Sequence, residues 1–291
     1  MSPISPRIVL QTAAAMVAFA ANSLLCRIAL VGGWIDAPTF ASVRIGSGAL
    51  LLAWLVRGTD RGARAPVDRW AVLSLAVYLL PFTLAYLTLD AGSGALLLFG
   101  AAQLTMLAVG LYRGERCSWL GWGGMAAAAI GFVALLAPAS GGAHFGGAAL
   151  MTIAGVAWGA YSLRGHTSRQ PLVSTAQNFW LVLPWAIAIN VLFASGVHVS
   201  AQGFALAAAS GMLGSALGYI VWYAALPRLT AIAAGTVQLS VPVIAAVGGV
   251  LVLHEHPTRR LVVCGIAILG GIALVARQRY GPAALAGRIS S

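Results

Sequence analysis

Residues 92–112 read GSGALLLFGAAQLTMLAVGLY, a run of 21 residues without a single charged side chain. A helix of about 20 apolar residues is long enough to cross the hydrocarbon core of a bilayer. The rest of the chain has the same character, because 60% of its 291 residues are hydrophobic, only 8% are charged and the mean hydropathy is +0.91. Soluble domains carry about 25% charged residues. The composition therefore excludes an ordinary soluble protein.

Similar apolar runs recur along the whole chain, separated by clusters of Pro, Gly, Asp and Arg. We expect spans at residues 8–30, 38–56, 70–89, 92–112, 118–137, 146–164, 172–194, 203–226, 230–253 and 259–276. The runs are too continuously apolar for barrel strands, and lipid requires that every backbone group be satisfied internally. The predicted fold class is an all-α integral membrane protein with ten transmembrane helices.

The basic residues set the expected orientation. All seventeen are arginines, against six acidic residues, and the formal net charge is +11. With the N-terminus inside, Arg259 and Arg260 lie outside, Arg27 and Arg44 lie within spans, and the remaining arginines lie on the inner side. Because cytoplasmic loops carry such an excess, we expect a multi-pass protein of the bacterial inner (plasma) membrane with both termini cytoplasmic. The positive charge then requires no nucleic acid partner.

The two halves of the chain resemble each other. Residues 18–24, AFAANSL, align with residues 157–163, AWGAYSL, and Glu115 and Glu255 close the fourth and ninth runs. We expect two five-helix repeats, 1–140 and 141–291. An odd number of spans inserts the second repeat inverted, which is typical of secondary transporters with a substrate cavity at the repeat interface. The alternative is a chance match between helices rich in Ala and Leu.

Several short motifs resemble a known family. They are Pro38 to Arg44, Gly114-Glu115-Arg116, Gly121 to Gly131, Tyr223-Ala224-Ala225-Leu226 and Pro242 to Glu255. The chain resembles the EamA-domain transporters of the drug/metabolite transporter superfamily, and within them the YddG-type amino-acid exporters. The resemblance implies ten helices around a central cavity and export of amino acids or related metabolites. One departure is Ala102, which stands where the family often has the proline that corresponds to Pro242.

The sequence contains no arrangement typical of an enzyme or a metal site. No phosphate-binding loop is present, so no cofactor and no ATPase subunit are expected. His254 and His256 are two residues apart and would point away from each other on a helix, which does not match a zinc site. We therefore expect no catalytic residues and no metal, and membrane lipids and a small-molecule substrate as partners.

The acidic residues all lie in loops or near the ends of the expected spans. They are Asp36, Asp60, Asp68, Asp90, Glu115 and Glu255. Intramembrane carboxylates are the usual proton or cation relays, so we expect facilitated diffusion by alternating access, with proton antiport through peripheral groups as the second possibility. A midplane without carboxylates suits cargo that is zwitterionic or neutral overall.

Helical spacing indicates which polar and aromatic side chains line the expected cavity. The candidates are Asn22, Tyr78, Phe82, Tyr86, Phe99, Gln103, Trp158, Tyr161, Tyr219, Gln238 and Pro242. Each aromatic ring could instead pack against lipid or a neighbouring helix, and each amide could bond another helix. Pro242 predicts either a broken helix that exposes backbone groups to substrate or a simple packing kink.

Arg44 and Asp90 are candidates for charge in an outer cavity. An unpaired arginine in hydrocarbon costs about 2.5 kcal/mol or more. Arg44 is therefore expected to snorkel outward, to pair with Asp36 or Asp90, or to attract a substrate carboxylate.

Three other functions stay open from the sequence. One is a proton-coupled drug, nucleotide-sugar or metabolite transporter of the same superfamily. The others are a membrane-embedded enzyme and a structural membrane subunit.

Overall fold

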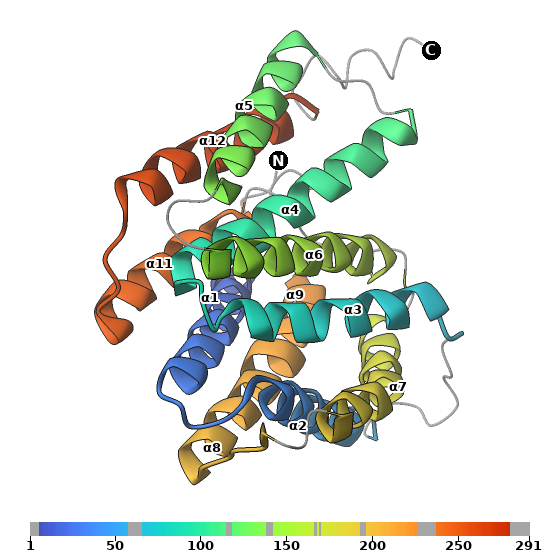
Figure 1. Cartoon of the computed structure of the whole chain (residues 1–291). Coiled ribbons are helices and arrows are strands. Elements are labelled where there is room, and N and C mark those ends of the chain that lie inside the picture. The colour runs from blue at the N-terminus through green and yellow to red at the C-terminus, as the bar shows by residue number, and fades with distance from the viewer. Residues whose placement is uncertain are drawn as a thin grey trace.

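The computed structural model describes residues 6–57, 66–114, 118–137, 142–165, 168, 170–192, 196–225 and 237–279, and they are helical almost throughout (Figure 1). The elements are α1 (Pro6–Val31), α2 (Ala37–Val56), α3 (Arg69–Ala85), α4 (Ala91–Tyr112), α5 (Trp119–Leu136), α6 (Gly142–Gly165), α7 (Pro171–Leu192), α8 (Ala201–Ala209), η2 (Ser210–Leu217), α9 (Gly218–Ala225), α11 (Ser240–Leu253) and α12 (Arg259–Arg279). The segments α8, η2 and α9 form one continuous helical run whose middle, η2, is a π-helix.

Short polar residues begin many of these helices, as capping preferences predict. The carboxylate of Asp36 accepts the Thr39 amide at 2.9 Å to start α2, and Asp68 accepts the Trp70 amide at 3.0 Å to start α3. Hydroxyl groups do the same for α5, α8 and α12, and they belong to Ser118, Ser200 and Thr258. The residues that interrupt the apolar runs thus also satisfy the first amides of the helices that follow.

Seven helices in the described residues are long and apolar enough to cross a membrane. Two more apolar helices, α3 and α11, are shorter, at 17 and 14 residues. The expected third span, 70–89, is too long, because α3 ends at Ala85 and its last turn closes with the tighter bond from the Tyr86 amide to the Thr83 carbonyl. Part of the expected ninth span, residues 226–236, lies outside the described residues.

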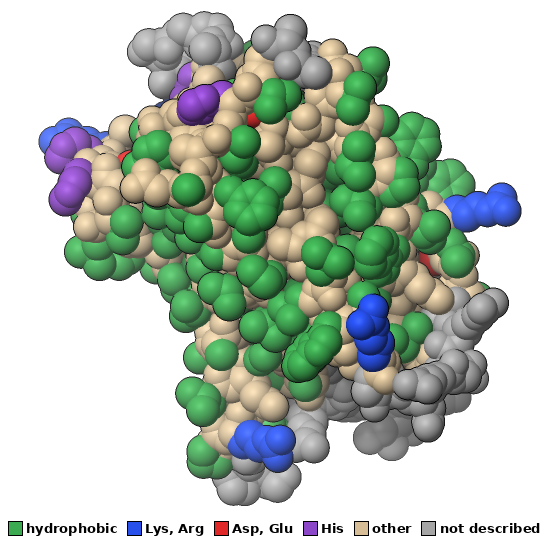
Figure 2. Space-filling view, turned by 90° about the horizontal axis from the view of Figure 1, so that it is seen from below, with side chains coloured by type: hydrophobic (Ala, Val, Ile, Leu, Met, Phe, Trp, Pro, Cys, Tyr) green, Lys and Arg blue, Asp and Glu red, His purple; other side chains and the backbone are tan. Residues whose placement is uncertain are grey.

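The surface facing away from the helix contacts is apolar. Figure 2 shows one face of the molecule, where hydrophobic side chains are spread across the described surface, charged side chains are few and histidines gather on one side. Large side chains such as Trp54, Trp185 and Ile266 are each more than 60% exposed. A protein in water rarely exposes so much contiguous apolar surface, whereas lipid chains match it. The chain is therefore a multi-pass membrane protein.

Polar contacts tie together the loops at one end of the bundle, which we call the predicted outer end. The Asp36 amide donates to the His198 carbonyl at 2.9 Å and the Ser200 amide to the Trp34 carbonyl at 2.8 Å, around an antiparallel bridge between Ile35 and Val199. At the opposite end, the predicted inner end, Arg164 pairs with Asp68 at 3.1 Å.

The run from α8 to α9 can be counted as the eighth helix, α11 as the ninth and α12 as the tenth. With this count, the main contacts between helices repeat when each helix is replaced by the one five places along the chain. Helix α3 packs on α6, and the run from α8 to α9 packs on α1; α4 packs on α6, and α11 packs on α1. Three further pairs are their own counterparts, namely α2 with α7, α4 with α11 and α5 with α12. Figure 1 shows α3 beside α6 and α5 beside α12. Helix α1 thereby packs mainly against helices from the second half of the chain.

Candidate functional site

Nine buried or half-buried aromatic side chains meet between the two halves of the bundle. This aromatic cluster comprises Phe19, Tyr78, Phe82, Tyr86, Trp158, Tyr161, Phe179, Tyr219 and Trp222. The ring of Trp158 stacks on Tyr219 at 5.3 Å and lies 5.4 Å from Tyr78. The structure thus gathers six of the predicted cavity aromatics and packs them against each other rather than against lipid.

The two copies of the repeated sequence motif contact each other inside this cluster. Phe19 and Trp158 occupy matching positions of the two repeated motifs, and their ring centroids lie 6.4 Å apart, edge to face. Each ring also contacts a tyrosine, Tyr219 in the case of Phe19 and Tyr78 in the case of Trp158. Edge-to-face and stacked pairs of this kind stabilise by about 0.5–1.5 kcal/mol beyond burial.

A polar network runs beside the rings at the depth of Asn22. The Asn22 amide donates to the Tyr78 hydroxyl at 3.4 Å, and its carbonyl oxygen accepts from the Ser210 hydroxyl at 2.6 Å. Asn22 lies in α1, Tyr78 in α3 and Ser210 at the start of η2, so the network joins both halves of the chain. The predicted amide therefore bonds other helices, and its hydroxyl partners are buried with it.

The position of Arg44 differs from two of the expectations drawn from the sequence. Arg44 neither snorkels nor pairs with Asp36 or Asp90, since its side chain is 1% exposed in the middle of the network. Its Nη2 donates to the Tyr78 hydroxyl at 2.8 Å and its Nε to the Ser215 hydroxyl at 3.3 Å. The guanidinium lies over the rings of Phe82 and Tyr78, at 4.6 and 5.1 Å. Hydroxyls and ring faces thus replace the expected carboxylate.

The π-helix η2 reaches this network because two of its residues are glycines. A Cβ at Gly211 would collide with the Arg44 carbonyl oxygen and the Ser47 hydroxyl, and one at Gly214 would lie 2.7 Å from the Cβ of Asn22. The wider turn also places the Ser215 hydroxyl 3.4 Å from the Ser210 carbonyl oxygen. Short π-helices are frequent at functional sites, and this one carries both serines of the network.

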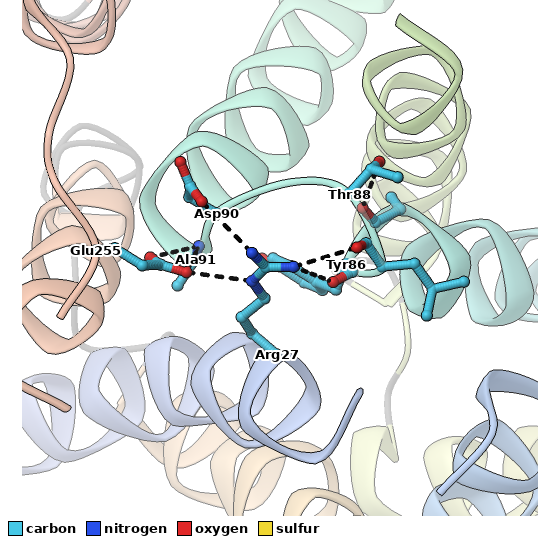
Figure 3. A network of polar contacts seen from close by, with 8 residues as sticks. Arg27, Tyr86, Thr88, Asp90, Ala91 and Glu255 are labelled. Atoms are coloured by element: carbon cyan, nitrogen blue, oxygen red, sulfur yellow. Dashed lines mark hydrogen bonds and ion pairs between the residues drawn. The ribbon is translucent and has the colours of Figure 1, made fainter. Parts of the chain in front are cut away.

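A second network closes the predicted outer end, as Figure 3 shows. Arg27 donates to the Tyr86 carbonyl at 2.8 Å and forms ion pairs with Glu255 at 3.2 Å and Asp90 at 3.5 Å. Asp90 therefore pairs with Arg27 and not with Arg44. The contact with the Tyr86 carbonyl also explains why α3 ends early, because that group would otherwise accept a helical hydrogen bond.

Glu255 takes the place of a capping residue for α4. Its Oε2 accepts the Ala91 amide at 2.9 Å, while Asp90, the residue before the helix, makes no cap bond with its side chain. Partial burial raises the pKa of the Glu255 carboxyl above its usual range, against the opposing effects of the Ala91 amide and Arg27. This carboxyl is thus poised to bind a proton more readily than an exposed glutamate.

The remaining predicted residues lie around α4 and α11. Gln103 donates to the side chain of Gln238 at 3.4 Å, so these two amides bond each other, and Phe99 is buried in the hydrophobic core outside the aromatic cluster. Val237 and Gln238 are helical and the chain turns at Leu239, three residues before Pro242. Pro242 then lies in the first turn of α11, where its missing amide costs no helical bond.

A pocket of about 210 Å³ adjoins the aromatic cluster toward the predicted inner end. It lies between α2, α7 and α9, and it is lined by Leu52, Pro171, Leu172, Thr175, Tyr219, Ile220 and Ala224. Tyr219 belongs to both the pocket and the cluster, so the cluster forms part of its wall. The lining is apolar apart from the hydroxyls of Thr175 and Tyr219 and suits an apolar side chain.

Sequence reasoning missed several members of the site. Phe19 carried a usable signal, because the repeat aligns it with Trp158, a predicted cavity residue. The apolar pattern predicts that Arg27 lies within a span but not that it pairs with Glu255, which is 228 residues away in sequence. Ser210 and Ser215 carried no signal, because isolated serines in a run of small residues are common in any membrane helix.

Within the described residues, no three His, Cys, Asp or Glu side chains are grouped so that they could hold a metal ion. His254 instead ends α11 with a left-handed backbone, φ 55°, which turns the chain and brings Glu255 back toward α4. The His254-Glu255-His256 segment is therefore a helix end whose acidic member joins the outer network.

Comparison with known proteins agrees with this architecture. Residues 145–277 match the EamA-like transporter family. An uncharacterised protein of Pseudomonas aeruginosa is 46% identical over 97% of this chain and 98% of its own length. A protein of Streptantibioticus cattleyicolor named "Probable terminal-alkyne amino-acid exporter" is 31% identical over 66% of each chain.

A solved crystal structure shares the fold. It superposes with a TM-score of 0.65 over 93% of this chain and 98% of the other, at 17% sequence identity. The family match, the two relatives and the helical membrane architecture lead to one assignment: the chain belongs to the EamA-like transporter family.

Proposed function

We propose that this protein is a secondary transporter that exports amino acids or related zwitterionic and amphipathic metabolites by facilitated alternating access. As a member of a transporter family it is not an enzyme. The observation that carries the proposal is the aromatic cluster with its Asn22 and Arg44 network, built from both halves of the chain and free of any carboxylate from the described residues. The naming of a relative as an amino-acid exporter supports the cargo class.

The proposed architecture is ten transmembrane helices in two inverted repeats, 1–140 and 141–291, around this site. The exchange pattern of helix contacts supports it, because the most extensive contacts between the halves have counterparts five helices along. The contact of Phe19 with Trp158 supports it at the level of residues, since matching positions can touch only near a symmetry axis. The location is the bacterial inner membrane, with both termini in the cytoplasm.

The two ends of the bundle support an inward-facing arrangement. The predicted outer end is tied by the Arg27 network and by the bridge between Ile35 and Val199, whereas the pocket beside Tyr219 lies toward the predicted inner end. Export would begin with cargo that enters beside α2, α7 and α9 and rests against the aromatic cluster. Release would require the outer network to open.

The proposal is tested by counterflow in proteoliposomes. Purified protein is reconstituted with a high internal concentration of one amino acid, and uptake of a labelled panel of amino acids, nucleotide sugars and cationic drugs is followed without a pH gradient. We expect uptake of amphipathic amino acids above that of empty liposomes. Uptake restricted to nucleotide sugars or drugs, or dependent on a pH gradient, would contradict the cargo or the mechanism.

The environment of Glu255 favours a second candidate mechanism, in which export of a similar cargo is coupled to protons. Its carboxyl is partly buried, has a raised pKa and holds the closed end through Arg27 and Ala91. A proton taken up there could be exchanged for cargo. Transport that rises with an imposed pH gradient in the natural protein but not in Glu255→Gln would select this mechanism.

A further inference from the structure

Arg44 holds a positive charge inside the bundle that no described acidic residue neutralises. One of its guanidinium nitrogens, Nη1, is buried without a hydrogen-bond partner within the described part of the chain, although Nε and Nη2 are both bonded. Buried polar groups are normally satisfied, and a buried charge is normally paired. The guanidinium nitrogen without a partner is therefore a candidate binding group for an anion.

The acidic side chains of the described residues all form their contacts away from Arg44. Asp36 caps α2 and accepts the His198 amide, and Asp68 caps α3 and pairs with Arg164. Asp90 and Glu255 both pair with Arg27 at the predicted outer end. None of these four carboxylates pairs with Arg44, so within the described residues its charge is balanced only by hydroxyls and ring faces.

The surroundings hold the guanidinium in one orientation. Two hydrogen bonds, to Tyr78 in α3 and to Ser215 in η2, fix its edge, while Phe82 and Tyr78 cover its face. Tyr78 in turn contacts Trp158 at 5.4 Å, which places the aromatic cluster directly beside the charge. A fixed cation next to a wall of rings matches a molecule with a carboxylate at one end and an apolar group at the other.

We propose that Arg44 binds the carboxylate of the transported molecule through Nη1 while the aromatic cluster holds its apolar side chain. The inference rests on the proposed transport function and adds a requirement to it. The cargo must carry a carboxylate, and an amine with the same side chain but without the carboxylate is rejected. The Arg44 side chain is then a specificity determinant for an amphipathic acid.

The test uses three probes that differ only in their charged groups. L-Phenylalanine carries both groups, 3-phenylpropionate lacks the amine and phenylethylamine lacks the carboxylate. Binding is followed as the shift in the thermal unfolding temperature of the full chain in detergent, and transport by counterflow. The variants are Arg44→Gln, which removes the charge, Arg44→Lys, which keeps it, and Arg113→Gln, a control that removes an exposed arginine at the end of α4.

We expect the natural protein and Arg113→Gln to respond to phenylalanine and phenylpropionate and not to phenylethylamine. Arg44→Gln should lose both responses and raise the KM for phenylalanine about tenfold to a hundredfold, as expected for a hydrogen bond between charged groups. Arg44→Lys should keep the preference for a carboxylate with weaker binding. Without ligand, the unfolding temperature of Arg44→Gln should stay close to that of the natural protein, because the loss of the bonds to Tyr78 and Ser215 is offset by the removal of an unpaired buried charge.

Two outcomes would overturn the assignment of Arg44. One is an unchanged KM and an unchanged response to phenylpropionate in Arg44→Gln. The other is a lowered unfolding temperature of Arg44→Gln with its ligand response intact, which would make Arg44 structural. If no amino acid is transported but phenylpropionate stabilises the natural protein and not Arg44→Gln, the transport proposal fails while the carboxylate site stands.

Discussion

At the scale of single residues, the site depends on hydroxyl groups that serve two partners. The Tyr78 hydroxyl accepts from Arg44 and from the Asn22 amide, and the Ser215 hydroxyl lies between Arg44 and the Ser210 carbonyl. In a buried network the loss of one member leaves its partners unsatisfied. Removal of a single oxygen atom is therefore felt across three helices.

Tyr78→Phe tests this dependence. It keeps the ring that contacts Trp158 but leaves Arg44 Nη2 and the Asn22 amide without their acceptor. We expect a loss of about 1–3 kcal/mol in unfolding free energy, measured by thermal unfolding in detergent. Tyr112→Phe, at an exposed position at the end of α4, is the matched control and should change stability by less than about 0.5 kcal/mol. Equal stability of the two variants would show that the network is not held by this hydroxyl.

At the scale of elements, the helices could be predicted far better than their irregularities. The bilayer demands runs of apolar residues, so α2, expected at 38–56, lies at Ala37–Val56, and α4, expected at 92–112, lies at Ala91–Tyr112. The early end of α3 and the π-helix η2 could not be predicted in this way. They depend on Arg27 and on the backbone of α2, which only the folded chain brings near.

The same distinction applies to the candidate site. Aromatic side chains at helical spacing on α3 and α6 were predicted together and do meet in the aromatic cluster. The partners of Arg44 and Arg27 were not predicted, because hydrophobic periodicity says which face of a helix is buried but not which helix it meets. Ser215 is 171 residues from Arg44 in sequence, and no local pattern joins them.

The close approach of η2 to α2 predicts a glycine effect. In Gly211→Ala the added Cβ would collide with the Arg44 carbonyl oxygen and the Ser47 hydroxyl, so η2 must move. We expect a loss of about 1–3 kcal/mol in unfolding free energy. Gly123→Ala in α5, where an added Cβ meets no atom within 4 Å, should be neutral or stabilising. Thermal unfolding of both variants checks this, and equal losses would disprove the close approach.

The outer network predicts a dependence on pH. Because partial burial raises the pKa of Glu255 above its ordinary value of 4.5, protonation favours this closed end over one in which the carboxyl is hydrated. The preference is present at low pH and is lost as the pH rises from about 4.5 through the raised pKa. The outer end should therefore open more readily as the pH increases across that range.

Cys26 provides a reporter for this opening. It is buried in α1, next to Arg27. With Cys117 and Cys264 replaced by Ala, its rate of modification by a membrane-impermeant thiol reagent is compared with the rate in the same background carrying Glu255→Gln. The ratio of the two rates should change with pH, because only the natural side chain titrates; a ratio that stays constant with pH would refute the role of Glu255. The comparison cancels the pH dependence of the thiol itself.

At the scale of the whole molecule, the arginines predict which end of the bundle faces the cytoplasm. In a background without native cysteines, His256→Cys at the predicted outer end should react in intact cells with an impermeant maleimide, because positive-inside sorting places that loop outside. Arg113→Cys at the predicted inner end should react only after the membrane is permeabilised. The reverse pattern would invert the bundle and turn the proposed direction of entry around.

The meeting of Phe19 with Trp158 has a consequence for how mutations act. If the two access states differ by an exchange of conformation between the repeats, each ring inherits the surroundings of the other, and their mutual contact survives the exchange. A substitution on this axis would alter the energy of both states by similar amounts and leave their populations balanced. A substitution far from the axis, as at Arg27, has no such compensation and would bias the resting state.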